Sequence, residues 1–386
     1  MSALEFAAAA AVLRLVSLIA SLFPIREELL VASPRGAHLS PQLAALSSAM
    51  SRLQPHLRQR HLLEPYGYSL RAKIAYLLRT IRGTWYLQRA RITIIDNAWL
   101  PVHVVPRRRG TIVVQAWHAE GAYKRFGHAV NGGMHESASL DAVLHRGYSL
   151  ALVSGEPART PFAEAFRMPR EDVAAVGPLR GAWLADATRV AAARDAVLAR
   201  WPQLAGKRIL LVAPTFRGRG AGRSIGGGIS LKELRSKLPA DWTIVAKGHA
   251  HVADDAALTG ADLILDAAIH LEDLFPIADV LLTDYSSSIF LWSLLERPLV
   301  IDMSDAAAYR EHPGLFLDPA EPASAFIGDR VADATAAAGA ITRGHVDGTA
   351  WRAFSERHLG PRGELAGAPE RAAAAIVQRA GLSLPE

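Results

Sequence analysis

The chain has 386 residues, of which 50% are hydrophobic and 21% charged, a globular composition with room for two domains. It contains no cysteine, which excludes disulfide bridges and cysteine-ligated metal centres. The net charge of +6 is unevenly distributed along the chain. Residues 1–125 hold 17 Lys/Arg and 6 Asp/Glu, a balance of +11, so residues 126–386 carry −5. The basic first part favours an anionic partner.

The first predicted element is an apolar helix within residues 1–25, from the run ALEFAAAAAVLRLVSLIASLFPI at 3–25. Glu5 precedes the apolar core, whereas a signal peptide begins with basic residues, and Arg14 makes a bilayer span costly. Two interpretations remain, a helix at the membrane interface and a helix packed on the domain. We predict the first, which makes a membrane surface a partner of the chain. No other apolar run is long enough to span a bilayer.

Short apolar runs then alternate with helical patterns, which predicts parallel sheets covered by helices. A stretch rich in Ala and Arg at 183–201 predicts a helix that ends at Pro202 and Gly206. We therefore predict an α/β fold with two Rossmann-like domains, 26–205 and 206–386, facing each other across a cleft, with ligands beyond the carboxyl ends of the strands. The predicted strands are 28–32, 92–95, 111–115 and 150–153 in the first domain, and 208–213, 242–246, 263–265, 280–283 and 299–301 in the second.

The strand 111–115 is followed by AWHAEG at 116–121, which places His118 just beyond a strand end. Imidazole titrates near neutral pH and is suited to general-base catalysis. The alternative is a histidine that only packs beside Trp117. Lys124 and Arg125 follow, and they could meet phosphate or face solvent.

Cationic side chains also follow two strands of the second domain. Arg217 ends the segment PTFR at 214–217, and the glycine-rich run behind it matches neither the dinucleotide fingerprint nor the P-loop, so we interpret it as a loop. Lys247, His249 and His251 follow strand 242–246 and could hold a pyrophosphate. A metal site is the alternative, but the two histidines would point to opposite sides of an extended segment and no third ligand is evident. We predict no metal.

The segment TDYSSS at 283–288 follows strand 280–283 and precedes a predicted helix at 289–296. Hydroxyl and backbone N–H groups gathered at a helix N-terminus favour an anion. The alternative is an ordinary serine N-cap. Three consecutive serines exceed what a cap requires, so we predict phosphate binding.

Taken together, these segments resemble the CDP-glycerol glycerophosphotransferase family, whose members prime or extend teichoic acids and related capsular polymers. The resemblance covers most of the chain, and the order and spacing of its blocks agree with the family. The blocks are LFPI at 22–25, DNAWLP at 96–101, QAWH at 115–118, APTFR at 213–217, KGH at 247–249, LTDYSS at 282–287 and ERP at 296–298.

The resemblance implies a GT-B-like architecture without cofactor or obligatory metal, a CDP-polyol donor in the C-terminal domain and a lipid-linked anionic acceptor in the N-terminal domain. His118 would take the proton of the acceptor hydroxyl, which would attack the β-phosphorus of the donor and release CMP. His249 would act with it at the pyrophosphate. The implied substrate-binding residues are Arg217, Lys247, Thr283, Asp284, Ser286, Ser287 and Glu296.

The chain departs from the family pattern in several places. Ala119 follows the histidine where the family has Gly, Ala250 stands in place of Pro, and YREHPGLFL at 309–317 replaces an Arg-Gly-aromatic block. These changes bear on the donor more than on the fold. Glycerol phosphate is the expected unit, and ribitol or another polyol phosphate stays open.

Two alternatives share this architecture. One is a nucleotide-sugar glycosyltransferase, which would release a nucleoside diphosphate, and the other is a non-catalytic envelope-binding descendant. A nucleic-acid partner is not expected, because the basic region is not interleaved with stacking aromatic residues. A CDP-linked donor and a lipid-linked acceptor together predict a peripheral protein at the cytoplasmic face of the plasma membrane. The chain length favours adding one or a few units.

Overall fold

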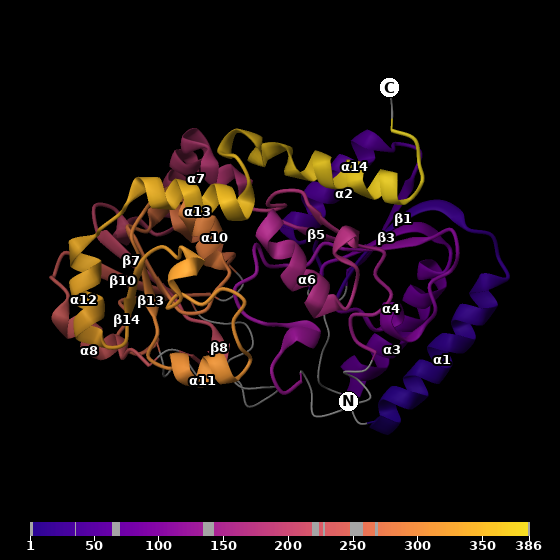
Figure 1. Cartoon of the computed structure of the whole chain (residues 1–386), viewed down its shortest axis with the longest axis horizontal. Coiled ribbons are helices and arrows are strands. Elements are labelled where there is room, and N and C mark those ends of the chain that lie inside the picture. Colours follow the sequence, from indigo (N-terminus) through magenta and orange to yellow (C-terminus); the bar gives the residue numbers. More distant parts are fainter. Residues whose placement is uncertain are drawn as a thin grey trace. The chain divides into compact units, whose positions relative to one another are not determined.

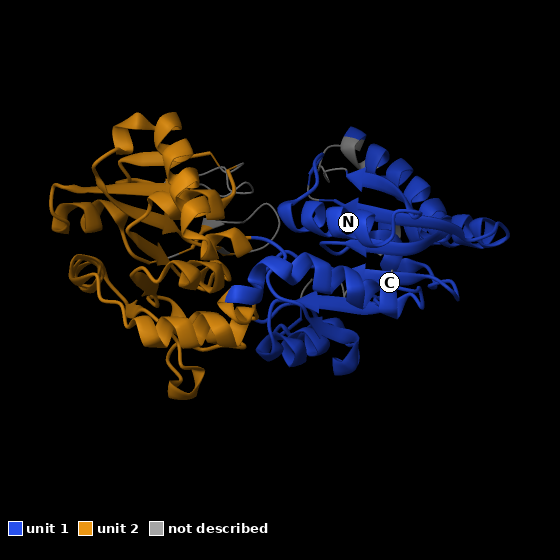
Figure 2. Cartoon of the chain, turned by 90° about the horizontal axis from the view of Figure 1, so that it is seen from above, with its two compact units in different colours: residues 1–119, 125–180, 363–386 blue, residues 120–124, 181–362 orange. Residues whose placement is uncertain are grey.

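The computed structural model describes residues 3–34, 36–63, 70–133, 143–217, 224–226, 228–247, 258–266 and 269–384. The chain folds into two compact units (Figure 2). Unit 1 comprises residues 1–119, 125–180 and 363–386, and unit 2 comprises residues 120–124 and 181–362.

Unit 1 is built on a six-stranded parallel sheet with the order β2-β1-β3-β4-β5-β6 (Figure 1). Inner strands with sequences such as ARITII and LALV suit a sheet buried on both faces. The strand order reverses between β1 and β3, so the topological switch point lies there. The strands are β1 (Arg26–Ser33), β2 (Arg58–Leu63), β3 (Ala90–Ile95), β4 (Ile112–Gln115), β5 (Leu150–Val153) and β6 (Val173–Ala175).

Helices cover both faces of this sheet, and alternate residues of β1 show the two sides. Leu29 and Val31 pack with α2 and α14, whereas Leu30 and Ala32 pack with Leu13 of α1 and its neighbours. The helices of unit 1 are α1 (Ala3–Ser21), α2 (Pro41–Leu53), α3 (Leu70–Leu87), α4 (Leu100–Val104), η1 (Gly127–Ala129), η2 (Glu156–Ala158), α6 (Arg159–Phe166), η3 (Arg170–Asp172) and α14 (Ala368–Arg379).

The N-terminal helix α1 packs one face on the domain and exposes the other. Leu13 and Ala20 are fully buried, and the Arg14 Nε donates a hydrogen bond to the Val104 carbonyl (3.1 Å). Large apolar side chains of the other face are exposed, among them Leu15 and Leu18, and Leu22 just after the helix is exposed too. In the part of the chain that the structure describes, no helix is long and apolar enough to cross a bilayer.

Unit 2 contains a second six-stranded parallel sheet, with the order β11-β10-β7-β12-β13-β14. Numbered within the unit, this order is 3-2-1-4-5-6, that of the Rossmann fold, and it reverses between β7 and β12. The strands are β7 (Arg208–Ala213), β10 (Trp242–Lys247), β11 (Leu263–Leu265), β12 (Val280–Thr283), β13 (Leu299–Asp302) and β14 (Asp329–Val331), with a separate antiparallel pair β8 (Phe216–Arg217) and β9 (Ser224–Ile225).

The helices of unit 2 include α7, which is the predicted Ala/Arg-rich helix. Asp186 caps it by accepting hydrogen bonds from the backbone N–H groups of Thr188 (2.9 Å) and Arg189 (3.2 Å). The helices are η4 (Ala182–Ala185), α7 (Ala187–Arg200), η5 (Pro202–Leu204), α8 (Leu231–Lys237), α9 (Leu271–Leu274), η8 (Phe275–Ile277), α10 (Ser288–Trp292), η9 (Ser293–Leu295), α11 (Ala306–Glu311), η10 (Pro322–Ser324), α12 (Ala334–Arg343) and α13 (Gly348–Leu359), and η11 (Arg362–Gly367) leads from unit 2 back into unit 1.

The division into units differs from the predicted boundary at residues 205 and 206. Helix α7 belongs to unit 2, because it packs on α9 and η8 and its Arg194 donates to the Pro276 carbonyl (3.1 Å). Helix α14 returns to unit 1, where Ile376 and Val377 pack in the core beside α2 (Figure 1). Contacts made after folding, and not position in the chain, decide both assignments.

The predicted strands are all present, and three sheet strands were missed. Strand β2 has the polar sequence RQRHLL and lies at a sheet edge, where none of its residues is buried. Strands β6 and β14 are three residues long and also lie at edges. Edge strands carry a weak apolar pattern, which explains the omission.

Candidate active site

One group of candidate residues lies within unit 1 at its switch point, beyond the ends of β1, β3 and β4. His118 is half-buried in the turn that follows β4, as predicted, and its Nδ1 lies 3.2 Å from the backbone carbonyl oxygen of Asp96, just beyond β3. A carbonyl oxygen only accepts, so the hydrogen is assigned to Nδ1. The other ring nitrogen, Nε2, then carries the lone pair that a general base needs.

The Trp117 ring packs beside the imidazole, with 4.3 Å between ring centroids, and Phe126 stacks on the indole at 5.2 Å. Trp117 has φ +51°, a left-handed conformation that is uncommon outside glycine. The predicted packing of His118 beside Trp117 is therefore present together with the orientation of a base, and the two interpretations do not exclude each other.

A buried group of rings extends from Trp117 into unit 1. His145 lies 5.7 Å from Trp117 and 5.9 Å from His103 between ring centroids, and its Nδ1 is 3.1 Å from the Tyr148 hydroxyl. Burial lowers the pKa of His103 to about 4, although its hydrogen bond to the Arg146 carbonyl opposes the shift. His103 is therefore neutral at physiological pH.

The His103 imidazole predicts a loss of stability in acid. Its pKa is about 4 when folded and 6.5 when unfolded, so the unfolded chain binds the proton more tightly, and stability present above pH 6.5 falls as the pH drops towards 4. Across this range the loss is about 3 kcal/mol from His103 alone. Urea unfolding at pH 7 and pH 4 measures it. His103→Asn keeps a donor for the Arg146 carbonyl but cannot titrate, so its pH dependence should be about 3 kcal/mol smaller; an unchanged dependence would contradict the assignment.

A separate group of candidate residues lies within unit 2 at its switch point, where β7 and β12 end. Asp284 is buried, with 1% of its surface exposed, and its carboxylate accepts hydrogen bonds from the Thr215 N–H and hydroxyl (2.8 Å each). The Thr283 hydroxyl donates to the Ala213 carbonyl (2.6 Å). These bonds join the ends of the two strands, so Thr283 and Asp284 have structural partners within unit 2.

Arg217 joins this group through two carboxylates. Its guanidinium lies 2.8 Å from Asp284 and 2.7 Å from Asp305, and it stands over the ring of Tyr309, which stacks on Tyr285 at 3.8 Å. Burial alone would lower the pKa of Arg217, but its hydrogen bond to Asp305 and the charge of Asp284 outweigh this and raise the pKa. Arg217 therefore stays charged and is held in a fixed place.

Asp305 and Tyr309 were not predicted from the sequence. No local pattern reveals them, because Asp305 reaches Arg217 across 88 residues of chain. The structure also explains why glycine stands at position 226 of the glycine-rich run. The Cβ atom of any other residue there would lie 2.3 Å from the Arg217 guanidinium.

Lys124 belongs to unit 2, although His118 nearby in sequence belongs to unit 1. Its segment forms an antiparallel bridge with Leu315, and the Tyr123 carbonyl accepts from Phe316 N–H (2.9 Å). Burial lowers the pKa of Lys124, and the charge of Asp284 opposes the shift. Lys124 was predicted either to meet phosphate or to face solvent, and it does not face solvent. Arg125 instead pairs with Glu164 of unit 1 (2.9 Å).

The serines predicted to bind phosphate begin helix α10. The Ser286 hydroxyl lies 2.8 Å from that of Ser288 and accepts from the Ser288 N–H (3.3 Å). Ser287 is the N-cap residue but makes no capping bond with its side chain. The Ser287 side chain therefore does not cap the helix, Ser286 has a local partner, and phosphate binding stays a prediction.

The remaining predicted residues are spread out. Lys247 ends β10, and burial lowers its pKa while Glu272 opposes the shift. His249 lies outside the described residues. Glu296 follows η9, at the far end of the helical segment that starts at Ser288. It pairs with Arg352 (3.3 Å) and Arg362. The structure therefore does not bring Glu296 to the serines, because a helix separates its two ends.

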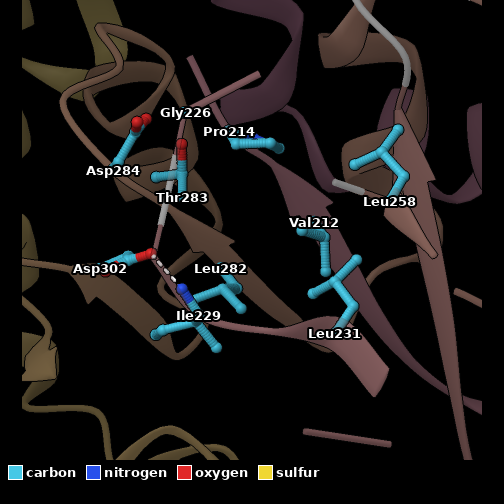
Figure 3. Close-up of a pocket in the computed structure, with 10 residues that line it drawn as sticks. All are labelled: Val212, Pro214, Gly226, Ile229, Leu231, Leu258, Leu282, Thr283, Asp284 and Asp302. Carbon is cyan, nitrogen blue, oxygen red and sulfur yellow. Dashed lines mark hydrogen bonds between the residues drawn. The ribbon is translucent and has the colours of Figure 1, made fainter. Parts of the chain in front are cut away.

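A small pocket of about 30 Å³ lies beyond β7, β12 and β13 (Figure 3). Its walls include Val212, Leu282 and Thr283, and Asp302 accepts from the Ile229 N–H (3.3 Å). This volume is that of one or two water molecules. Among the described residues, His, Asp and Glu side chains nowhere gather in a group of three that could hold a metal ion.

Comparison with known proteins shows the family of the chain. Residues 16–359 match the model of a family described as CDP-Glycerol:Poly(glycerophosphate) glycerophosphotransferase. The chain is similar to the teichoic acid ribitol-phosphate primase of Bacillus spizizenii, with 32% identity over 300 residues that make up 76% of this chain and 77% of that protein. It is also 29% identical over 240 residues to the teichoic acid poly(ribitol-phosphate) polymerase of that organism, covering 61% of this chain and 39% of the polymerase.

Among solved structures, the chain is similar to a variant of the wall teichoic acid polymerase TagF soaked with CDPG. The TM-score is 0.69 at 16% identity, and the match covers 96% of this chain and 93% of that chain. At this identity the likeness concerns the fold. Together with the two sheets described above, it confirms the predicted pair of Rossmann-like domains of the GT-B type.

Proposed function

The chain belongs to the CDP-glycerol:poly(glycerophosphate) glycerophosphotransferase family, and on that premise we propose that it transfers a polyol phosphate from a CDP-linked donor to a lipid-linked acceptor. The observation that carries the proposal is the orientation of His118. Its Nδ1 is held by the Asp96 carbonyl (3.2 Å) at the switch point of a Rossmann-like sheet, which assigns the lone pair of a base to Nε2.

In the proposed reaction, His118 Nε2 accepts the proton of an acceptor hydroxyl. The oxygen then forms a bond to the β-phosphorus of the donor, and the bond between that phosphorus and the bridging oxygen breaks. CMP leaves with the electron pair. General-base catalysis of this kind contributes about 10²–10⁴-fold to a rate.

We propose that unit 2 binds the donor through Arg217 and through side chains outside the ion pairs of Arg217. Arg217 is shared between Asp284 and Asp305, and with the buried Lys124 these four charges sum to zero. The pyrophosphate then depends on further donors, for which Ser287 and Lys247 are the proposed residues, with His249 as predicted from the sequence. Arg217 holds the loop beyond β7 in place and contacts the donor from there.

The two relatives described above are ribitol-phosphate enzymes, whereas the family model is described by glycerophosphate. We therefore propose CDP-ribitol as the better donor, which differs from the glycerol phosphate expected from the sequence. The identity of 32% with the primase supports this choice.

Product analysis tests the proposed function. Purified protein is offered a lipid-linked acceptor with CDP-ribitol, CDP-glycerol or nucleotide sugars in parallel. The proposal requires release of CMP that depends on both acceptor and CDP-polyol, fastest with CDP-ribitol. Release of a nucleoside diphosphate from a nucleotide sugar would instead make the chain a glycosyltransferase, and absence of both turnover and donor binding would support the non-catalytic alternative.

We also propose that α1 and α3 attach the chain to the cytoplasmic face of the plasma membrane. The two helices pack together, and their outer side chains Leu18, Leu22 and Leu78 are 64%, 79% and 62% exposed. Basic residues stand next to this surface: the Arg108 guanidinium donates to the Phe23 carbonyl (2.6 Å) at the end of α1. Exposed apolar side chains with adjacent arginines fit an interface rich in anionic lipid.

Replacing Leu18 and Leu22 by Glu should weaken binding to vesicles of phosphatidylglycerol and phosphatidylcholine at least 10-fold. Each leucine contributes about 1.5–3 kcal/mol when its side chain leaves water, and the new carboxylates are repelled by anionic lipid. Vesicle sedimentation measures the partitioning. The matched control is Ile264→Glu, an exposed apolar residue of unit 2, which should bind like the wild type. Equal binding of the double variant and the control would remove α1 from the membrane interface.

A further inference from the structure

Gln42 is a buried glutamine in the first turn of α2, with 4% of its surface exposed, and it contacts both segments that flank His118. Its Nε2 lies 3.4 Å from the Trp117 carbonyl oxygen and 3.5 Å from the Asp96 carboxylate. Both partners only accept, which assigns the amide nitrogen to this side. One side chain therefore joins the residue before His118 to the residue whose carbonyl holds the imidazole.

The backbone of Trp117 needs such support. Its φ of +51° is a strained conformation for a bulky residue, and strain of this kind persists only where the surroundings impose it. The Gln115 Oε1 accepts the Trp117 N–H at 2.9 Å, and Gln42 holds the Trp117 carbonyl. Two buried glutamines thus hold the peptide groups on both sides of the residue that sets the direction of His118.

The Asp96 side chain forms the other half of the arrangement. The Ser40 hydroxyl donates to the same carboxylate oxygen as Gln42, at 2.8 Å, and the Asp96 backbone carbonyl accepts from His118 Nδ1 at 3.2 Å. Residues at the start of α2, beyond β1, therefore fix the segment beyond β3, which in turn fixes the ring beyond β4. The three segments meet at the switch point of unit 1.

The Gln42 Oε1 argues against a purely structural role. It is buried and has no hydrogen-bond partner among the residues that the structure describes. An unpaired buried amide oxygen is unfavourable, and an apolar side chain of the same size would fill this place at lower cost. Packing alone therefore does not account for a glutamine at this position.

We propose that Gln42 is a positioning residue for His118, which holds the Trp117–His118 turn and Asp96 in the geometry that keeps Nδ1 on the Asp96 carbonyl and the lone pair of the base on Nε2. The proposal rests on the role of His118 given above. Without the amide, the turn loses the bond to its carbonyl and the imidazole gains access to its other tautomer and to other orientations. A displacement of about 1 Å at a reacting group can cost about 100-fold in rate.

The matched pair of variants is Gln42→Leu and Gln54→Leu. Gln54 ends the same helix, is also buried at 3% exposure, and its Nε2 donates to the Ser383 carbonyl at 2.7 Å. Gln42→Leu should lower kcat for CMP release at least 10-fold, with the KM for the donor within about twofold and a Tm no lower than that of Gln54→Leu. If the two variants have the same kcat, or if Gln42→Leu changes only KM, the proposal is wrong.

A second measurement does not depend on turnover. Long-range 1H–15N correlation spectra of protein with 15N-labelled histidine distinguish the two imidazole tautomers, and the signals missing in His118→Asn identify His118 among the 14 histidines. The wild type should show hydrogen on Nδ1, and Gln42→Leu a mixture of tautomers. A single unchanged tautomer in Gln42→Leu would overturn the proposal even where no donor is turned over, so this result is separable from failure of the proposed function. If Gln42→Leu does not fold, Ser40→Ala, which removes the other bond to the Asp96 carboxylate, should show the same mixture.

Discussion

Replacing His118 by Ala should lower the rate of CMP release by about 10²–10⁴-fold while the protein still binds the CDP-polyol. The Asp96 carbonyl holds Nδ1 of the imidazole, so the lone pair lies on Nε2, and the ring stands in the turn just beyond β4. Without a base, the acceptor hydroxyl must lose its proton to water. Turnover is measured by CMP release, and donor binding by isothermal titration calorimetry.

The matched control is His56→Ala, because His56 is an exposed histidine of the same unit, located between α2 and β2. It should retain wild-type turnover. Near-normal turnover of His118→Ala would refute the general-base role, whereas loss of donor binding together with turnover would assign His118 to substrate binding. Only a large loss of kcat with intact donor binding agrees with the mechanism.

Replacing Asp284 by Asn should lower the free energy of unfolding by about 3 kcal/mol. The carboxylate is 1% exposed and accepts from the Thr215 N–H and hydroxyl while pairing with Arg217 at 2.8 Å. An amide offers one acceptor where the carboxylate offers two, and its NH₂ group would face the donors of Thr215 and Arg217. The loss of one partner leaves the guanidinium with a poorly compensated charge.

Urea denaturation of Asp284→Asn and of a control measures this difference. Asp241 pairs with Arg208 at 3.7 Å, and both side chains are at least half exposed, so Asp241→Asn should cost less than about 1 kcal/mol. Equal stability of the two variants would mean that the Asp284 ion pair contributes no more than a surface pair. A stable Asp284→Asn that fails to bind donor would instead move Asp284 from a supporting role to direct substrate contact.

The sequence carried enough information for the family and for most of the sheet architecture. Runs such as RILLVA and LALV are too apolar for anything but buried strands, and their alternation with helical segments predicts two parallel sheets. The family match over residues 16–359 confirms the resemblance seen in the ordered blocks. Edge strands such as β2 escaped prediction, because a half-solvated strand keeps polar residues on both sides.

The candidate site divides in the same way. His118 and Asp284 were found because each follows a strand, and parallel strands end at a common edge. Gln42 and Asp305 were not found, because they reach their partners across 75 and 88 residues and no local pattern reports such a distance. Glu296 lay within a matching block, yet the helix that begins at Ser288 carries it away from the serines.

The sequence by itself determined which segments are strands, which residues stand at their ends and which family the chain belongs to, since these depend on local polarity and on the order of motifs. Only the tertiary structure decided that α7 packs in unit 2, that α14 returns to unit 1, and that Arg217 is held between two aspartates. Those outcomes depend on which apolar faces and which charges meet after folding. These contacts form between segments that are distant in the chain, so the local sequence does not encode them.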